Sequence, residues 1–276
     1  MVAEWNLRLA DGRTVRVADS GGPGLTVVWH HGTPHTGALL APVVSPAAAR
    51  GLRLVSYARP GYGGSAAQPG RDVASAATDV AGVVDALGID RFATVGASGG
   101  GPHALACAAL LRERVIAVAA IAAPAPYAED ADWFVGMADD RALRAATAGR
   151  DARMRHAETA EFDPAAFTDA DWAALSGTWA ALGEDAGRAA TAAPDGAVDD
   201  DVAYVSAWGF DPATIAVPTL LLHGAEDRMV PPSHTERLRT AIPHAAWWPR
   251  PGDGHVSVLG AYPAVLDWLV AQVPSS

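Results

Sequence analysis

Short apolar segments alternate along the chain with longer segments in which apolar and alanine residues recur at helical spacing. The segments flanking Asp11-Gly12 predict an opening hairpin, and later apolar segments rich in β-branched or aromatic residues predict further strands. The predicted strands are Trp5–Leu9, Thr14–Ala18, Leu25–His30, Leu52–Tyr57, Phe92–Gly96, Val115–Ala122, Thr219–His223 and Ala245–Trp248. The predicted helices are Ala38–Arg50, Val73–Leu87, Pro102–Leu111, Ser233–Ile242 and Tyr262–Val270. Because the inner strands are apolar on both faces, we expect an α/β fold, with a mostly parallel sheet covered by helices on both sides.

The alternation stops between about residues 127 and 210, where acidic residues, Ala and Trp recur at helical spacing. Helix starts are predicted there at Asp130, Thr168 and Asp199. We therefore expect a core of residues 1–127 and 211–276 and an inserted helical cap of residues 128–210. Open α/β sheets bind ligands at the carboxyl ends of their strands, so the cap is expected to cover that edge.

Length and charge narrow the possible functions. The chain has 276 residues, half of them hydrophobic, which is enough for one substantial core and an insertion. Its net charge is -11, and its 20 basic residues are scattered arginines without a single Lys. A nucleic-acid partner requires clustered basic residues, so we expect none.

The sequence also predicts a cytoplasmic protein that does not enter a membrane. Cys107 is the single cysteine, so the fold does not depend on an intramolecular disulfide. The first residues lack the basic and apolar stretches of a signal peptide. The longest apolar run, Val115–Ala123, is about half of the roughly 20 residues that a membrane helix needs.

The strongest local signal for chemistry is Gly96–Gly100, which reads Gly-Ala-Ser-Gly-Gly. It follows an apolar strand and precedes a helix, the context in which a G-x-S-x-G turn presents a nucleophilic serine. The turn requires residues without side chains two positions before and after Ser98, and both are glycine. A flexible glycine-rich turn without a catalytic role is the alternative interpretation.

A serine hydroxyl needs a base, and His255 is the candidate among nine histidines. It lies in a glycine-rich loop after the last predicted strand and before the last helix. Seven other histidines lie at strand ends or in or near helices and are set aside as candidates for the base: His30, His31, His103, His156, His223, His234 and His244. The ninth, His35, belongs to the loop after Leu25–His30.

The imidazole needs a carboxylate, and Asp227 follows the predicted strand Thr219–His223. The chain order serine, aspartate, histidine is the order expected for this kind of sheet. Glu226 and Asp253 remain competing candidates at this stage.

The oxyanion of a tetrahedral intermediate needs N–H donors. The residue after the nucleophile, Gly99, is one candidate, and Thr33 is the other because Pro34 has no N–H. The alternative for this loop is a metal site formed by His30, His31 and His35, but no carboxylate or cysteine lies at ligand spacing. We therefore expect no metal.

Taken together, these motifs resemble the α/β-hydrolase superfamily of serine hydrolases. The resemblance rests on the segments at residues 31–34, 59–65, 96–100, 223–231 and 254–255, which occur in the order seen in that superfamily and span nearly the whole chain except the cap. It implies an eight-stranded, mostly parallel sheet, a helical cap, no cofactor, and Thr33 and Gly99 as oxyanion donors. Ser98 stands where haloalkane dehalogenases and epoxide hydrolases of this fold have Asp. Thr33 and His35 depart from the His-Gly-Gly-Pro-Gly loop usual in proline iminopeptidases.

The predicted activity is hydrolysis of a small carboxylic ester or lactone through an acyl-enzyme, as in a carboxylesterase. Aromatic cap residues are expected to line the substrate pocket, although for any single one of them cap-to-core packing is the better explanation. An aminopeptidase or amidase with the same triad is the alternative, and a non-catalytic ligand-binding protein is a more remote one. The predicted pocket residues are Trp133, Phe134, Met137 and Trp179.

Overall fold

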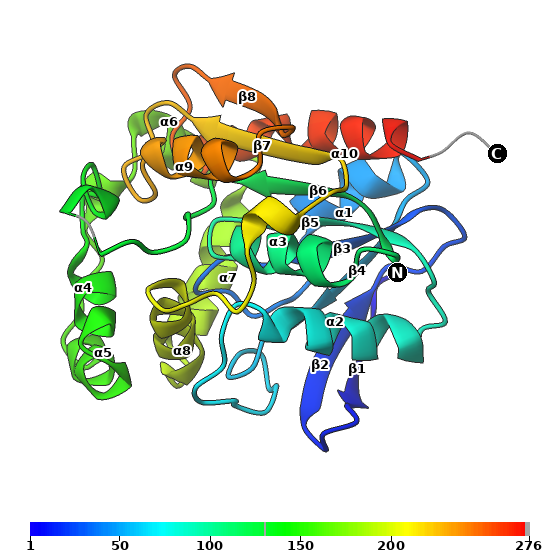
Figure 1. The fold of residues 1–276 in the computed structure, drawn as a ribbon, viewed down its shortest axis with the longest axis horizontal. Helices are drawn as coiled ribbons and strands as arrows, with labels where there is room; N and C mark the ends of the chain where they lie inside the picture. The colour runs from blue at the N-terminus through cyan, green and yellow to red at the C-terminus, as the bar shows by residue number, and fades with distance from the viewer. Residues whose placement is uncertain (130, 274–276) are drawn as a thin grey trace.

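The computed structural model describes residues 1–129 and 131–273, and it places a single sheet at the centre of the molecule (Figure 1). The sheet has eight strands in the order β1-β2-β4-β3-β5-β6-β7-β8. β1 and β4 pair antiparallel with β2, and every other pair is parallel. The strands are β1 (Ala3–Arg8), β2 (Thr14–Asp19), β3 (Thr26–His30), β4 (Arg53–Tyr57), β5 (Phe92–Ala97), β6 (Val115–Ile121), β7 (Thr219–Gly224) and β8 (Ala246–Arg250). The predicted mostly parallel, eight-stranded sheet is confirmed.

Helices cover both faces of the sheet, and each face has its own hydrophobic core. α2 (Ser75–Ala86), α3 (Gly100–Leu110) and α9 (Ser233–Ala241) contribute to the core on one face. α1 (Ala41–Ala48) and α10 (Tyr262–Ala271) contribute to the core on the other. The inner strands β3, β5 and β7 are buried along their whole length, as their apolar sequences predict.

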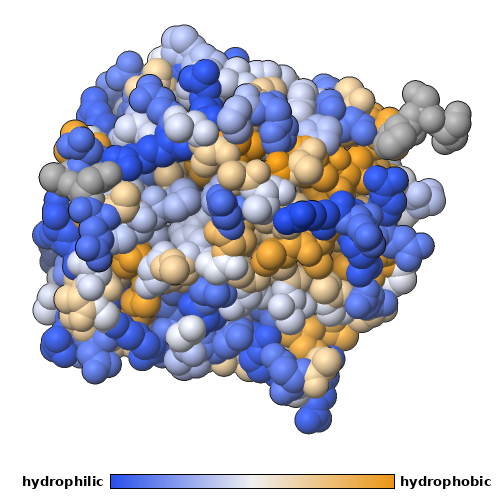
Figure 2. Space-filling model, in the orientation of Figure 1, coloured by the Kyte–Doolittle hydropathy of each residue, from blue (hydrophilic) through white to orange (hydrophobic). Residues whose placement is uncertain are grey.

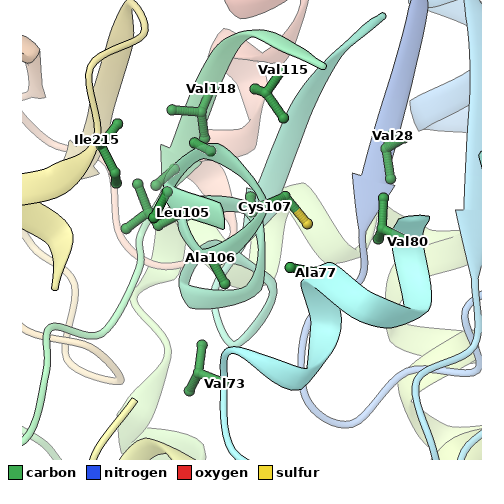
Figure 3. Close-up of a cluster of buried hydrophobic side chains, with 14 of the residues drawn as sticks. Val28, Val73, Ala77, Val80, Leu105, Ala106, Cys107, Val115, Val118 and Ile215 are labelled. Carbon is green, nitrogen blue, oxygen red and sulfur yellow. The ribbon is translucent and has the colours of Figure 1, made fainter. Parts of the chain in front are cut away.

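Small residues let α3 pack closely on the sheet. Gly100 to Ala109 are all buried, and a Cβ on Gly101 would overlap the side chain of Ala123. Figure 3 shows Cys107 of α3 directed toward Ala77 and Val80 of α2, and Leu105 on the other side of α3, toward Ile215. α3 begins at Gly100, two residues after Ser98, so this packing anchors the turn that carries the predicted nucleophile.

The segment between β6 and β7 is helical, as predicted, and lies beside the ends of these strands (Figure 1). Its helices are α4 (Arg141–Thr147), α5 (Arg150–Ala157), α6 (Asp169–Leu175), α7 (Ala180–Ala190) and α8 (Asp195–Tyr204). Residues 128–210 remain the predicted limits of this cap. Figure 2 shows mostly hydrophilic residues over α4 and α5, in keeping with the Arg-rich sequence of α5.

The predicted helix starts in the cap had different outcomes. Thr168 is the N-cap of α6 and forms a capping box with Asp171, so this prediction is confirmed. The start predicted at Asp199 was wrong, because α8 begins at Asp195 and the Asp199 carboxylate accepts a hydrogen bond from Arg150 instead of capping a helix. Asp130 lies outside the described residues.

Within the described ranges, no helix has the length and apolarity to cross a bilayer.

Candidate active site

The turn between β5 and α3 holds Ser98 in an unusual backbone conformation. Its φ is +54°, in the left-handed region that residues other than glycine rarely adopt. The Ser98 N–H donates to the Ile121 carbonyl of β6 at 2.8 Å. A Cβ on Gly96 would overlap the backbone of Gly100, and a Cβ on Gly100 would overlap that of His30. The glycines on either side of the serine are therefore required by close backbone approach, as the sequence predicts.

Ser98, His255 and Asp227 come together from three different loops. His255 Nε2 lies 2.9 Å from Ser98 Oγ, and its Nδ1 lies 2.7 Å from Asp227 Oδ2. Asp227 Oδ1 accepts hydrogen bonds from the N–H groups of Met229 and Val230, both at 2.9 Å. The structure thus places all three predicted residues in one hydrogen-bonded chain.

The competing carboxylates do not occupy this position. Glu226 is exposed, whereas Asp227 is buried. Asp253 lies beside His255 in sequence, but its carboxylate accepts a hydrogen bond from Arg250 at 3.0 Å. Of the three acidic candidates, Asp227 is the one that contacts the imidazole.

Burial and charge act in opposite directions on the two ionisable groups of this chain. Burial raises the pKa of Asp227, but the charges and hydrogen bonds of His255 and His223 outweigh it and hold that pKa well below its usual range. Burial lowers the pKa of His255, but the charge and hydrogen bond of Asp227 and the charge of Asp171 leave the pKa above its ordinary 6.5. Asp227 is therefore ionised at neutral pH and stabilises a protonated imidazole.

The histidines of the loop after β3 have separate partners. His30 contacts the Cys107 sulfur, His31 accepts from the N–H of Arg59 at 3.1 Å, and His35 contacts Asp185 at 3.1 Å. Burial lowers the pKa of both His30 and His31 well below 6.5. Among the residues that the structure describes, no three His, Cys, Asp or Glu side chains form a group able to hold a metal ion.

Thr33 and Gly99 lie next to each other beside the nucleophile turn. A Cβ on Gly99 would overlap the Thr33 hydroxyl and the hydroxyl of Tyr204. In the described part of the chain, neither the Thr33 N–H nor the Gly99 N–H donates a hydrogen bond to another protein group. Their use as oxyanion donors remains a prediction.

A buried aspartate of the cap, which no motif in the sequence marked, contacts the Thr33 loop. Asp200 of α8 accepts hydrogen bonds from Thr33 Oγ1 at 2.6 Å and Tyr62 at 2.8 Å, and it pairs with Arg59 and Arg71, both at 2.7 Å. Burial raises the pKa of Asp200, but the two arginines hold it well below its usual range. The Arg59 guanidinium also donates to the Gly32 carbonyl at 3.0 Å. Because that carbonyl shares a peptide group with the Thr33 N–H, Arg59 polarises the N–H toward a stronger donor.

Two more buried cap aspartates contact loops of the core. Asp185 of α7 accepts from the N–H of Thr36 at 2.9 Å and from its hydroxyl at 2.6 Å. Asp171 of α6 accepts from the backbone around His255, at distances given below. From sequence alone, an acidic residue on a predicted helix is expected to be exposed to solvent. No local sequence pattern indicates that Asp171, Asp185 and Asp200 are buried.

The predicted pocket residues lie in two separate packed clusters. Trp133, Phe134 and Met137 pack in a small cluster of the insert, where Trp133 is fully buried and its ring N–H donates to the Ala125 carbonyl at 3.2 Å. Trp179 is buried near Tyr262 in the core on the face of the sheet that α1 and α10 cover. These contacts give the four side chains a packing role. That they also line a substrate pocket remains a prediction.

The fold is similar to that of several solved structures. An esterase from Thermogutta terrifontis is 21% identical, with a TM-score of 0.72 over 98% of this chain and 99% of that one. The enol-lactonase from Burkholderia xenovorans LB400 is 22% identical, with a TM-score of 0.73 over 97% and 99%. A bromoperoxidase from Bacillus anthracis is 22% identical, with a TM-score of 0.76 over 98% and 100%. At this level of identity the similarity is one of fold.

The family comparison covers most of the chain. The model of the alpha/beta hydrolase fold matches residues 26–262, a range that includes β3 to β8, the insert, Ser98, Asp227 and His255. The chain therefore belongs to the alpha/beta hydrolase fold family.

Proposed function

We propose that the protein is a serine hydrolase that cleaves a small carboxylic ester or lactone through an acyl-enzyme intermediate. The observation that carries the proposal is the continuous hydrogen-bonded chain from Ser98 through His255 to Asp227, with distances of 2.9 and 2.7 Å. A serine hydroxyl is a weak nucleophile until a base takes its proton, and this chain provides the base and its orienting carboxylate.

In the first step, His255 Nε2 takes the hydroxyl proton as Ser98 Oγ attacks the carbonyl carbon. The resulting oxyanion lies against the N–H groups of Thr33 and Gly99, each worth about 3 kcal/mol of transition-state stabilisation. His255 then gives the proton to the leaving alkoxide, and the acyl group stays on Ser98. In the second step His255 takes a proton from water, the hydroxide attacks the acyl carbon, and the acid leaves as Ser98 recovers its proton.

Asp227 orients the imidazole and stabilises the imidazolium that forms in each step. Its lowered pKa keeps it ionised throughout the neutral range. The hydrogen bond to Nδ1 holds the tautomer in which Nε2 carries the lone pair that faces Ser98.

The three buried cap carboxylates that contact loops of the core support an ester or lactone over an aminoacyl substrate. An aminopeptidase needs a carboxylate that is available to the substrate ammonium group. Asp171, Asp185 and Asp200 all accept hydrogen bonds from loops of the core. Their acceptor positions are therefore engaged by the protein itself.

Labelling with a fluorophosphonate probe tests the nucleophile. The native protein is expected to take up one probe molecule, and Ser98→Ala should take up none. Ser206→Ala is the matched control, because Ser206 is exposed and its hydroxyl donates to the Val202 carbonyl of α8. Labelling that persists in Ser98→Ala would exclude Ser98 as the nucleophile.

A substrate panel tests the reaction. p-Nitrophenyl esters of increasing acyl length and a set of lactones are compared with aminoacyl p-nitroanilides, each with the native protein and with Ser98→Ala. We expect turnover of the esters or lactones that is lost in the variant. Turnover confined to the anilides would replace the proposal with the aminopeptidase alternative.

A further inference from the structure

The carboxylate of Asp171 joins the cap to the backbone that carries His255. Asp171 is the third residue of α6 and is buried. Its Oδ1 accepts hydrogen bonds from the N–H groups of Val256 and Ser257, both at 2.8 Å, and from the Ser257 hydroxyl at 3.0 Å. Its Oδ2 accepts from the N–H of His255 at 3.2 Å. One side chain of the insert thus binds three consecutive backbone N–H groups in the histidine loop.

Gly254, the residue before His255, lies in close contact with the Asp171 carboxylate. A Cβ on Gly254 would overlap the Asp171 carboxylate, so glycine is needed for the close approach. The Gly254 N–H donates to the Ser257 hydroxyl at 2.7 Å, and that hydroxyl donates to Asp171. The loop from residue 254 to 257 is therefore folded around the carboxylate.

We propose that Asp171 is a positioning residue of the active site, which holds the His255 backbone so that the imidazole stays in line between Ser98 and Asp227. This inference rests on the proposed function for its catalytic consequence. Asp171 does not contact the reacting atoms, and it acts through the loop that it binds. The insert then positions a catalytic residue in addition to lying beside the active site.

The negative charge of Asp171 also acts on the imidazole. The groups that face His255 from the elements around it are Asp227 from the loop after β7, Asp171 from α6 and the Ser98 hydroxyl from the turn after β5. His223 Nε2 lies 3.3 Å from Asp227 Oδ2, the oxygen that contacts His255. Since a nearby negative charge favours the imidazolium, removal of the Asp171 charge should lower the pKa of His255.

A helix cap without any role in catalysis is the competing explanation. The Asp171 carboxylate also accepts from the N–H and hydroxyl of Thr168 at 2.9 Å, and these bonds stabilise the start of α6. Thr168→Ala breaks this capping box but leaves the bonds from Asp171 to residues 255–257. If capping were the whole role, Thr168→Ala would reproduce every effect of a change at Asp171.

The decisive variant is Asp171→Asn, with Asp169→Asn as its matched control. Both changes remove one negative charge from the first turn of α6, but Asp169 is exposed. We expect Asp171→Asn to lower kcat by roughly 10- to 100-fold through misplacement of the imidazole, with KM little changed. We also expect the acid limb of kcat/KM to move to lower pH. Asp169→Asn and Thr168→Ala should leave kcat and the acid limb unchanged.

An NMR titration of the His255 ring separates this inference from the proposed function, because it needs no substrate. The signal is assigned with His255→Gln, and its midpoint should lie lower in Asp171→Asn than in Asp169→Asn. If the native protein cleaves no ester, the proposed function fails while the midpoint still tests the contact. A folded Asp171→Asn protein with the midpoint and kcat of Asp169→Asn overturns the inference.

Ser257→Ala provides a second test if Asp171→Asn does not fold. It removes the hydrogen bond from the Ser257 hydroxyl to the Asp171 carboxylate and the one that this hydroxyl accepts from the Gly254 N–H, and it keeps the Asp171 charge. We expect fluorophosphonate labelling to slow by at least roughly threefold, because each net hydrogen bond lost from the histidine loop corresponds to roughly three- to tenfold, without a change in the His255 midpoint. An unchanged labelling rate would overturn the positioning role.

Discussion

The hydroxyl of Tyr204 donates a hydrogen bond to the carbonyl oxygen of Gly99 at 2.8 Å. Tyr204 is the last residue of α8, and Gly99 follows Ser98 in the turn after β5. The same hydroxyl lies 3.0 Å from Thr33 Oγ1, which in turn contacts Asp200. A single cap side chain therefore links the two segments from which the predicted oxyanion donors come.

Tyr204→Phe should weaken both stability and turnover. The change leaves the buried Gly99 carbonyl without this donor, at a cost of about 1–3 kcal/mol in the free energy of unfolding. We expect kcat to fall because the Gly99 and Thr33 segments are no longer linked, with little effect on KM. Urea unfolding and steady-state kinetics measure the two effects. Tyr127→Phe, on a half-buried ring outside this network, is the control, and equal effects of both variants would contradict a link to the oxyanion donors.

Asp227→Asn should lower kcat by roughly 10⁴-fold, because the amide favours the wrong imidazole tautomer and no longer stabilises the imidazolium. Glu226→Gln makes the same chemical change one residue earlier on an exposed side chain and should leave kcat unchanged. Steady-state kinetics on the preferred ester compare the two. The reverse pattern would assign the acid to Glu226.

The pH dependence of kcat/KM should report the ionisation of His255 in the free enzyme. The imidazole must be neutral to take the serine proton, so activity is lost as the pH falls through its pKa. Because Asp227 and Asp171 raise that pKa above 6.5, the midpoint of the acid limb should lie above 6.5. A midpoint well below 6.5 would mean that another group controls this limb.

Ser98→Gly should be more stable than Ser98→Ala, although both variants are expected to be inactive. The φ of +54° is strained for any side chain, and glycine adopts it freely. We expect a difference of about 1 kcal/mol in the free energy of unfolding, reduced in part by the greater freedom of glycine in the unfolded chain. Urea unfolding of the two proteins gives this difference directly, and a more stable alanine variant would argue against strain at the turn.

Asp200→Asn should destabilise the protein strongly, because it leaves the buried Arg59 and Arg71 without their carboxylate. The expected cost is about 3–5 kcal/mol. Asp267→Asn removes an ion pair with Arg50 in which the aspartate is exposed, and it should destabilise the protein far less, because solvent screens the pair. Thermal and urea unfolding of both variants test the contrast. Similar losses would show that burial of the Asp200 cluster contributes little.

The strands, the core helices and the nucleophile turn were predicted from the sequence because each has a local signature. Apolar runs predict buried strands, and the glycines of residues 96–100 mark a turn that tolerates no side chains next to it. Helix ends were less regular: α1 begins at Ala41 instead of the predicted Ala38, with Pro42 in its first turn, where a missing N–H costs nothing. In the cap, Thr168 was found through its own capping pattern, whereas the start at Asp199 was wrong because an acidic run has no unique position as a cap.

The sequence by itself determined the α/β architecture and reduced the chemistry to Ser98, His255 and a short set of carboxylates. The sequence favoured Asp227 but left Glu226 open, and only the tertiary structure shows that Asp227 contacts His255, since adjacent residues of one loop differ in the direction of their side chains. Tertiary structure alone also brought Asp171, Asp185 and Asp200 from the cap onto the loops around the nucleophile. Asp171 and His255 are 84 positions apart, and no periodicity or motif encodes a pairing over such a separation. That pairing arises only when the insert folds back over the carboxyl ends of the strands.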